Sequence, residues 1–510
     1  MLFNSLHFAA FFPIVVVLYF ATPHRARWGL LLAASYYFYG SWNVKYLRLL
    51  WLSTVVDYAA ALLMGRHKTR EARRPYLIGS LVINLGLLAF FKYFNFVSES
   101  VQDGLAHLNV FVDTPYLDVL LPVGISFYTF QTLAYTIDVY RGKRAPERHL
   151  GYFALYVSYF PQLVAGPIER ADRLIPQLRA QRRFNYDDAA IGLCRIAYGY
   201  FKKLVVADRL ALFVNPVFAN PDQATTWTAT IAGVFFAFQM YCDFSGYSDI
   251  AIGTARMMGI RLSENFRRPF LAPSMGAFWQ RWHITLTTWL RDYIYGSIRG
   301  DRRATSLRRI MGVLVVFAAF GIWHGANWTF IVCGLIAGVF VILDQITAEP
   351  RSRLWRRAGE LLARPRMAEY EAASIVPAPR AEAIATALDH VRYWSGVVVT
   401  FAQVVFLFVL FRAATIDDAM TMYRAIFSFD FIVPPMEFAA SLLAIASGQS
   451  YFQLVVNLAM GLLGIVLLLV SYRLPPDLNV RHKTAYLVAI SLVILLLGTD
   501  AANEFIYFQF

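Results

Sequence analysis

FAAFGIWHGANWTFIVCG, residues 317–334, places an imidazole and an amide inside an otherwise apolar stretch. Apolar sequence leads into this segment and continues beyond it, but His324 and Asn327 interrupt it between two tryptophans. Polar groups are expensive inside a membrane, and glycine weakens a helix, so Gly325 beside the histidine adds to the interruption. We therefore expect a change of chain direction near His324, and the sequence around it decides what kind of fold contains that turn.

The composition is that of a membrane protein. The chain has 510 residues, of which 58% are hydrophobic and 16% charged, and its mean hydropathy is +0.49. A soluble protein of this size needs more charged surface. Candidate spans are residues 1–21, 29–45, 46–64, 76–96, 119–140, 187–211, 227–244, 395–413, 453–472 and 486–499. These spans predict an all-α polytopic bundle that forms one membrane domain over residues 1–510.

The charged residues predict the orientation of this bundle. The net charge of +14 comes from short basic loops, which the positive-inside rule explains without a nucleic-acid partner. The basic loops are residues 24–27, 66–74, 141–149, 170–183, 351–366 and 473–483. If these are cytoplasmic, both termini lie outside. Residues 351–392 are then a solvated cytoplasmic connector with an amphipathic piece. The first apolar run has no basic region before it, so we expect a retained span and no cleaved signal peptide.

This path requires two segments that enter the membrane and return. One is residues 151–169, which Pro161, Gly166 and Pro167 break. The other is residues 310–345, which turns near His324. Its first arm, 310–323, is about 21 Å long at helical rise, less than a hydrocarbon core of about 30 Å. We therefore expect His324 to lie within the membrane, where irregular backbone needs surrounding protein or a water-filled cavity.

A second histidine lies in an aromatic segment, residues 274–296. One helical face is formed by Trp279, Trp282, Leu286, Trp289 and Tyr293. His283 borders this face, and Arg281 falls largely on another. Tryptophan, tyrosine and arginine together are typical of a membrane–water interface. His283 is therefore either a hydrogen-bonded core residue or a reactive group.

Two further segments carry polar side chains in apolar surroundings. Residues 239–270 contain Asp243, Ser245, Ser248 and Asp249. These groups either form ion pairs with arginines in the same segment, namely Arg256, Arg261, Arg267 and Arg268, or face a phosphate-bearing substrate. Their spacing fits no metal loop, and the three cysteines lack CxxC spacing, so we predict no metal site.

The other polar segment is residues 121–142. Tyr128, Gln131 and Tyr135 lie three and four residues apart, on one helical face. Such a stripe lines either a hydrogen-bonded helix interface or a tunnel. For His324, the residues alone leave general base catalysis and a structural hydrogen bond open, because imidazole titrates near neutrality.

Taken together, the motifs resemble the membrane-bound O-acyltransferase family, in particular the bacterial branch that O-acetylates exopolysaccharides such as alginate. The matching stretches are MLFNSLHF, LPVGISFYTFQTLAYTIDVYRG, YFPQLVAGPIER, QMYCDFSGYSDIAIGTARMMGIRLSENFRRPF, FWQRWHITLTTWLRDYIYG, GIWHGANWTFIVCGL and FIYFQF. They keep the family's order along nearly the whole chain. One departure is that residues 333–338 lack a histidine common in close relatives.

The resemblance implies acyl transfer from a thioester, most simply acetyl-CoA, to a hydroxyl, with no bound cofactor. It implies a bundle with a central tunnel, His324 as general base and His283 as a group that orients or polarises the thioester. Candidate substrate-binding residues are Asn327, Trp323, Asp243, Ser245, Gln131, Tyr128 and Arg281.

The donor would approach from the cytoplasm and the acceptor from the opposite side, in a bacterial inner membrane whose lipids surround the chain. A periplasmic acetyltransferase or another polysaccharide-modifying protein is the expected partner. Two alternatives remain: D-alanyl transfer to teichoic acid, and transport of a sugar-lipid. The acceptor itself is not predicted.

Overall fold

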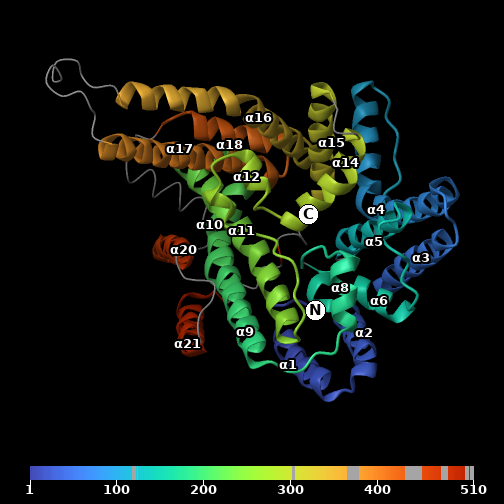
Figure 1. Ribbon diagram of the computed structural model, residues 1–510. Helices are drawn as coiled ribbons and strands as arrows, with labels where there is room; N and C mark the ends of the chain where they lie inside the picture. The colour runs from blue at the N-terminus through green and yellow to red at the C-terminus, as the bar shows by residue number, and fades with distance from the viewer. Residues whose placement is uncertain are drawn as a thin grey trace, which may run out of the picture. The chain divides into compact units, whose positions relative to one another are not determined.

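In the computed structural model, the described residues form helices joined by turns and loops (Figure 1). It describes residues 1–117, 122, 124–164, 166–300, 305–363, 378–430, 451–472, 480–499 and 505. The first elements are α1 (Leu6–Ala21), α2 (His24–Gly40), η1 (Val44–Tyr46), α3 (Leu47–Gly65), α4 (Arg70–His107), α5 (Ile125–Tyr140), α6 (Leu150–Ser158), α7 (Phe160–Leu163), α8 (Ala171–Arg179), α9 (Tyr186–Tyr200), η2 (Phe201–Ala207), α10 (Asp208–Ala219), η3 (Pro221–Gln223) and α11 (Thr226–Met257). They are followed by η4 (Pro269–Leu271), α12 (Met275–Trp279), α13 (Ile284–Leu290), η5 (Arg291–Tyr295), α14 (Gly296–Arg299), α15 (Ser306–His324), α16 (Trp328–Ala363), α17 (Ala378–Arg412), α18 (Ile416–Phe427), α20 (Tyr451–Ser471) and α21 (Val480–Leu497).

Within the described residues, five stretches of helix are long and apolar enough to cross a membrane. They are Val44–Gly65, Arg70–His107, Ser306–His324, Trp328–Ala358 and Ala385–Arg412. Shorter apolar helices cover Leu6–Ala21, Val455–Ser471 and His482–Leu497. These helices confirm the predicted all-α polytopic class. The central tunnel and the re-entrant character of two segments stay predictions.

The described residues form two compact units. The first comprises Met1–Asn265, Trp323–Asn327 and Met420–Phe510, and the second comprises Phe266–Ile322 and Trp328–Ala419. The extent of one membrane domain over residues 1–510 stays a prediction. The predicted connector is helical where it is described, because residues 351–363 continue α16 and residues 378–392 begin α17. Residues 364–377 of that connector lie outside the described residues.

Helices α9 and α11 of the first unit pack unusually closely and lie side by side (green, Figure 1). Two glycines on each helix, seven residues apart, face each other. A Cβ added to Gly253 would lie 2.5 Å from the carbonyl oxygen of Gly192, and one added to Gly199 would lie 2.6 Å from that of Gly246. The glycines therefore allow the two backbones to touch, as small residues do between membrane helices.

A buried carboxylate joins three helices of the same unit. Asp57 of α3 accepts hydrogen bonds from Ser80 and Asn84 of α4 and from Thr136 of α5, with Asn84 at 3.0 Å and Thr136 at 3.1 Å. Ser53 completes the cluster by donating to the amide oxygen of Asn84 at 2.6 Å. Because every polar atom in a membrane helix must find a partner, this network fixes how α3, α4 and α5 pack.

In the second unit, α15 and α16 form an antiparallel hairpin. A Cβ on Gly321 would lie 2.3 Å from the carbonyl oxygen of Phe330, and one on Gly334 would lie 2.3 Å from that of Phe317. The hairpin confirms the predicted turn after His324. The predicted length of its first arm is wrong, because α15 begins at Ser306 and has 19 residues. A helix of that length measures about 28 Å, so the depth of His324 no longer follows from a short arm and stays a prediction.

The aromatic segment 274–296 is also not one helix. α12 ends at Trp279, and α13 begins at Ile284 after a break at Gln280–His283. The apolar stripe is nevertheless buried: Trp282 is 2% exposed and Leu286 is fully buried. Burial of the stripe is thus preserved by short helical pieces with a kink between them.

Candidate functional site

His324 is the last residue of α15 and is 4% exposed. α16 begins four residues later, at Trp328, so Gly325 and Asn327 lie in the turn that joins the two helices. The imidazole packs against the indole of Trp323, with 4.7 Å between ring centroids. The polar interruption in residues 317–334 therefore forms a turn between two helices, with the buried imidazole of His324 at its start.

Trp323 connects this turn to α5. Its ring makes an edge contact with Phe127, at 5.7 Å between centroids, and stacks on Phe130 at 6.0 Å. The structure thus brings the histidine motif next to the helix that carries Tyr128 and Gln131, two predicted substrate-binding residues. These contacts all lie within the first unit.

Lys92 of α4 holds the same turn, and sequence reasoning missed it. Its Nζ donates to the backbone carbonyl oxygens of Trp323 at 2.6 Å and of His324 at 3.0 Å. The last carbonyls of a helix have no partner within the helix, and they attract cations because the helix dipole is negative at this end. The signal available in the sequence was a single lysine within the apolar run LLAFFKYFNF, residues 87–96.

Gln131 forms a hydrogen bond to a neighbouring helix, and Tyr135 forms one to the loop that follows α5. The Gln131 side chain donates to the carbonyl oxygen of Tyr156 in α6 at 2.5 Å, and Gln162 donates to the same oxygen at 2.7 Å. The hydroxyl of Tyr135 accepts from the backbone N–H of Glu147 at 2.8 Å. Of the two interpretations of this polar stripe, the structure shows the hydrogen-bonded helix interface at Gln131. Tyr128 is 2% exposed.

His283 belongs to the second unit and is fully buried. It caps α13 with φ 42° and ψ 52°, a left-handed conformation that few residues other than glycine adopt. Its ring lies 6.3 Å from that of Phe266, centroid to centroid. Burial lowers the pKa of His283 to about 3, so the imidazole is neutral at physiological pH.

Arg281 has a structural contact in the same unit. Its guanidinium donates to the carbonyl oxygen of Leu271 at 2.9 Å, and its own carbonyl accepts from the N–H of Arg267 at 2.9 Å. These bonds hold the loop that precedes α12 against the break before α13. A substrate-binding role for Arg281 stays a prediction.

Asp243 and Ser245 lie on α11 and face two lysines of η2, a π-helix. The Nζ of Lys203 lies 2.6 Å from Asp243 and 2.9 Å from Asp208, and Lys202 donates to Ser245 at 2.9 Å. π-Helical turns are frequent at functional sites, and this one lets two successive lysines reach α11. The signal missed in the sequence was this pair of lysines within a candidate span.

Asp249, the other carboxylate predicted here, pairs with Lys202 and with Arg195 of α9, the latter at 2.9 Å. The prediction that the arginines at 256–268 neutralise this segment is therefore wrong for Asp243 and Asp249. Arg256 instead pairs with Asp188 of α9 at 2.6 Å. Sequence proximity misled here because the partners come from the neighbouring helix.

Within the described residues, no three His, Cys, Asp or Glu side chains gather in a way that would hold a metal ion. The cysteines Cys194, Cys242 and Cys333 are free thiols.

Comparison with known proteins identifies relatives along most of the chain. Residues 147–355 match the family model described as MBOAT, membrane-bound O-acyltransferase family. The chain is 37% identical to the "Probable alginate O-acetylase AlgI" of Azotobacter vinelandii over 423 residues, which cover 82% of this chain and 76% of the relative. It is 36% identical to the peptidoglycan O-acetyltransferase of Helicobacter pylori, over 66% of this chain and 69% of that protein. A teichoic acid D-alanyltransferase of Bacillus subtilis is 26% identical over 43% of this chain and 58% of its own length.

Proposed function

Because this chain belongs to the membrane-bound O-acyltransferase family and is an O-acyltransferase, we propose that it moves an acetyl group from acetyl-CoA to a hydroxyl for the O-acetylation of an extracellular polysaccharide. Two relatives support the acetyl group and the class of acceptor, since their names specify alginate and peptidoglycan O-acetylation. The acceptor is the sugar itself or a serine of a periplasmic partner that then acylates the sugar.

The observation that carries this proposal is the placement of His324. It is a buried imidazole at the end of a helix whose last carbonyls are held by Lys92. A positioned imidazole can take the proton of a hydroxyl as the oxygen attacks the thioester carbonyl carbon. The carbon–sulfur bond then breaks, and the imidazolium returns the proton to the departing thiolate. The hydroxyl and the thioester thus become an ester and a free thiol.

His283 has a different role in this proposal. A neutral imidazole can donate an N–H to the oxyanion that forms on the thioester carbonyl, as preorganised donors do in acyl transfer. The low pKa of His283 supports this assignment, because the ring does not bind the proton that the reaction releases. The two histidines would then differ in function because they differ in environment.

The charge distribution supports a direction for the transfer. The basic loops face the cytoplasm by the positive-inside rule, so the donor reaches the protein from that side of a bacterial inner membrane. The acceptor hydroxyl then enters from the periplasmic side. Acetyl would cross the membrane through the protein while the CoA thiol stays in the cytoplasm.

Substitution of His324 tests its proposed role as the general base. In proteoliposomes supplied with radiolabelled acetyl-CoA and an acceptor polysaccharide, we expect His324→Ala and His324→Gln to lower kcat about 100-fold or more, because general base catalysis contributes about 10²–10⁴-fold. His107→Ala, at an exposed position in the last turn of α4, is the matched control and should keep wild-type turnover. Wild-type kcat in His324→Ala would refute the assignment.

D-Alanyl transfer is the second candidate. The match to a D-alanyltransferase supports it over part of the chain, at lower identity than the matches to O-acetyltransferases. Membranes containing the protein can be given acetyl-CoA or a D-alanyl carrier-protein thioester. We expect turnover with acetyl-CoA only, and turnover with the D-alanyl donor alone would favour the second candidate.

A further inference from the structure

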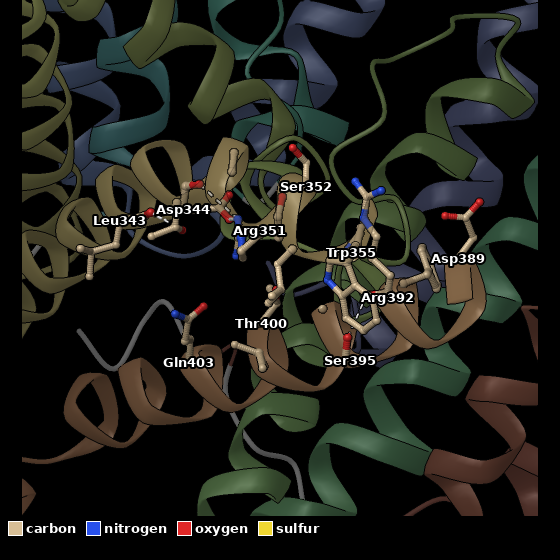
Figure 2. A pocket seen from close by; sticks show the side chains of 18 residues that line it. Leu343, Asp344, Arg351, Ser352, Trp355, Asp389, Arg392, Ser395, Thr400 and Gln403 are labelled. Carbon is tan, nitrogen blue, oxygen red and sulfur yellow. Dashed lines mark hydrogen bonds and ion pairs between the residues drawn. The ribbon is translucent and has the colours of Figure 1, made fainter. Parts of the chain in front are cut away.

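A cavity of about 770 Å³ opens between α16 and α17 in the second unit (Figure 2). The two helices lie side by side, and both contain candidate membrane spans, Trp328–Ala358 and Ala385–Arg412. The cavity is lined by the end of α16 that carries the basic run beginning at Arg351, which the positive-inside rule places at the cytoplasmic face. It contains neither His283 nor His324.

Two arginines and two aspartates line the cavity, so these four side chains sum to zero charge. Arg351 and Asp344 pair at 2.5 Å, and the other oxygen of Asp344 accepts from the N–H of Gly276 at 3.3 Å. Asp389 and Arg392 are exposed side chains of α17, one turn apart, and neither forms an ion pair or side-chain hydrogen bond within the described residues. The cavity lining therefore includes one cation, Arg392, and one anion, Asp389, that form no ion pair within the described residues.

Polar side chains continue deeper into the cavity. Thr400 is 4% exposed, and Gln403 is half-buried one turn further along α17, inside the candidate span. The amide of Gln403 forms no hydrogen bond within the described residues. An uncharged polar group at membrane depth usually faces a partner or a polar ligand, and Figure 2 shows that Gln403 is part of the cavity wall.

The rim of the cavity is apolar and aromatic. Leu343, Leu354 and Val399 line the cavity, and their exposed fractions are 49%, 66% and 56%, although all three lie on candidate spans. Trp355 and Tyr393 add aromatic rings at the arginine-bearing end. Aromatic rings with arginines mark the headgroup level of a membrane. The cavity therefore opens sideways to lipid.

We propose that this cavity binds a zwitterionic phospholipid of the phosphatidylethanolamine class. Its phosphate would lie against Arg392 and Arg351, and its ammonium would donate to Asp389. Thr400 and Gln403 lie one and two turns beyond Gly396, within reach of the glycerol esters. The acyl chains would follow the exposed apolar rim.

The zero charge sum is what selects this ligand. A free CoA-type donor carries several negative charges on its phosphates and has no cation for Asp389, whereas a zwitterion satisfies both free groups. An anionic lipid would satisfy Arg392 but leave the Asp389 carboxylate facing a second anion. This site is separate from the proposed acyl transfer, so a binding measurement tests it whatever the outcome of the acetylation assay.

The experiment measures lipid binding to the delipidated full chain by native mass spectrometry. The probes are phosphatidylethanolamine, phosphatidylcholine and phosphatidylglycerol with the same acyl chains, and acetyl-CoA as a competitor. Phosphatidylcholine keeps both charges but has no N–H for Asp389. The variants are Arg392→Gln, Asp389→Asn and Gln403→Leu, with Arg357→Gln as the matched control, since Arg357 is exposed on α16 but does not line the cavity.

We expect phosphatidylethanolamine to bind more tightly than the other two lipids. Arg392→Gln should weaken it about tenfold, since a charge-assisted bond is lost, and Arg357→Gln should leave its Kd unchanged. Asp389→Asn should abolish its preference over phosphatidylcholine, and Gln403→Leu, which keeps all four charged groups, should weaken all three lipids. The proposal is overturned if phosphatidylglycerol binds as tightly as phosphatidylethanolamine, if acetyl-CoA displaces the lipid, or if Arg392→Gln behaves like Arg357→Gln.

Discussion

At the scale of single residues, the backbone at His283 carries unusual strain. A residue with a Cβ in the left-handed region costs about 1–2 kcal/mol, and His283 adopts it while fully buried. The sequence predicted the importance of this histidine and its place beside the apolar stripe. It contained no glycine, proline or asparagine to signal a break at this position, so the kink arises from tertiary packing and could not be predicted locally.

The pKa of His283 predicts a pH dependence of stability. Burial lowers this pKa to about 3, below an unfolded value of about 6.5, so the folded state favours the neutral ring. This contribution is complete above about pH 6.5 and is lost as the pH falls toward 3, because only the unfolded chain binds the proton. Between about pH 7.5 and 5 the loss is about 2 kcal/mol.

Thermal unfolding in detergent measures this effect. The fall in Tm between these two pH values should be smaller in His283→Gln than in wild type, because glutamine does not titrate. His390→Gln, at an exposed position on α17, should behave like wild type. Equal falls in Tm for wild type and His283→Gln would show that His283 titrates normally.

Lys92 predicts a kinetic effect at the other histidine. Lys92→Met removes the donor to the carbonyls of Trp323 and His324, so the imidazole is less well held. We expect kcat for acetyl transfer to fall about 10- to 100-fold with KM little changed, since misplacement of a reacting group by about 1 Å is that costly. Lys92→Arg should restore part of kcat.

Lys45→Met, in the exposed η1 helix, is the control for the loss of a lysine. An effect of Lys92→Met on the amount of folded protein with unchanged kcat would make Lys92 a structural residue only.

At the scale of elements, what could be predicted depended on the range of the interaction. The hairpin at 310–345 followed from loop charges and hydropathy, which are properties of the chain itself. The ion pairs of Asp243 and Asp249 did not, because Lys203 and Lys202 belong to a π-helix about 40 residues earlier in the chain. Which helix lies beside α11 is decided by the glycine contacts of α9, and these have no distinctive signature in an apolar sequence.

The α9–α11 contact can be tested through its glycines. Gly253→Ala places a Cβ 2.5 Å from the carbonyl oxygen of Gly192, so the helices must separate, and overpacking of this kind typically costs about 1–3 kcal/mol. We expect a lower Tm and less folded protein. Gly86→Ala in α4, where a Cβ meets nothing within 4 Å, should be neutral or slightly stabilising. A wild-type Tm for Gly253→Ala would mean that the two backbones are not in contact.

At the scale of the whole molecule, composition and charge predicted the class and orientation, because membrane insertion acts on the entire sequence. The all-α class is confirmed, and the path of the chain through the bilayer stays a prediction. The roles of the two histidines depended on the family resemblance, since periodicity alone left a structural and a catalytic interpretation open for each. Both histidines are buried, and they differ in backbone conformation, which is left-handed only at His283, and in the residues that contact them.

The orientation makes a prediction that needs no substrate. α4 begins at Arg70, within the basic stretch 66–74, and ends at His107, and α5 returns the chain to the basic loop 141–149. In a variant without native cysteines, Lys143→Cys should react with a membrane-impermeant maleimide only after the membrane is opened to the cytoplasmic side, because its loop is basic. Asp113→Cys, in the exposed stretch after α4, should react in intact cells. Reaction of both positions from one side would mean that α4 and α5 together do not form the predicted out-and-back pair, and the donor would then lack its proposed side of entry.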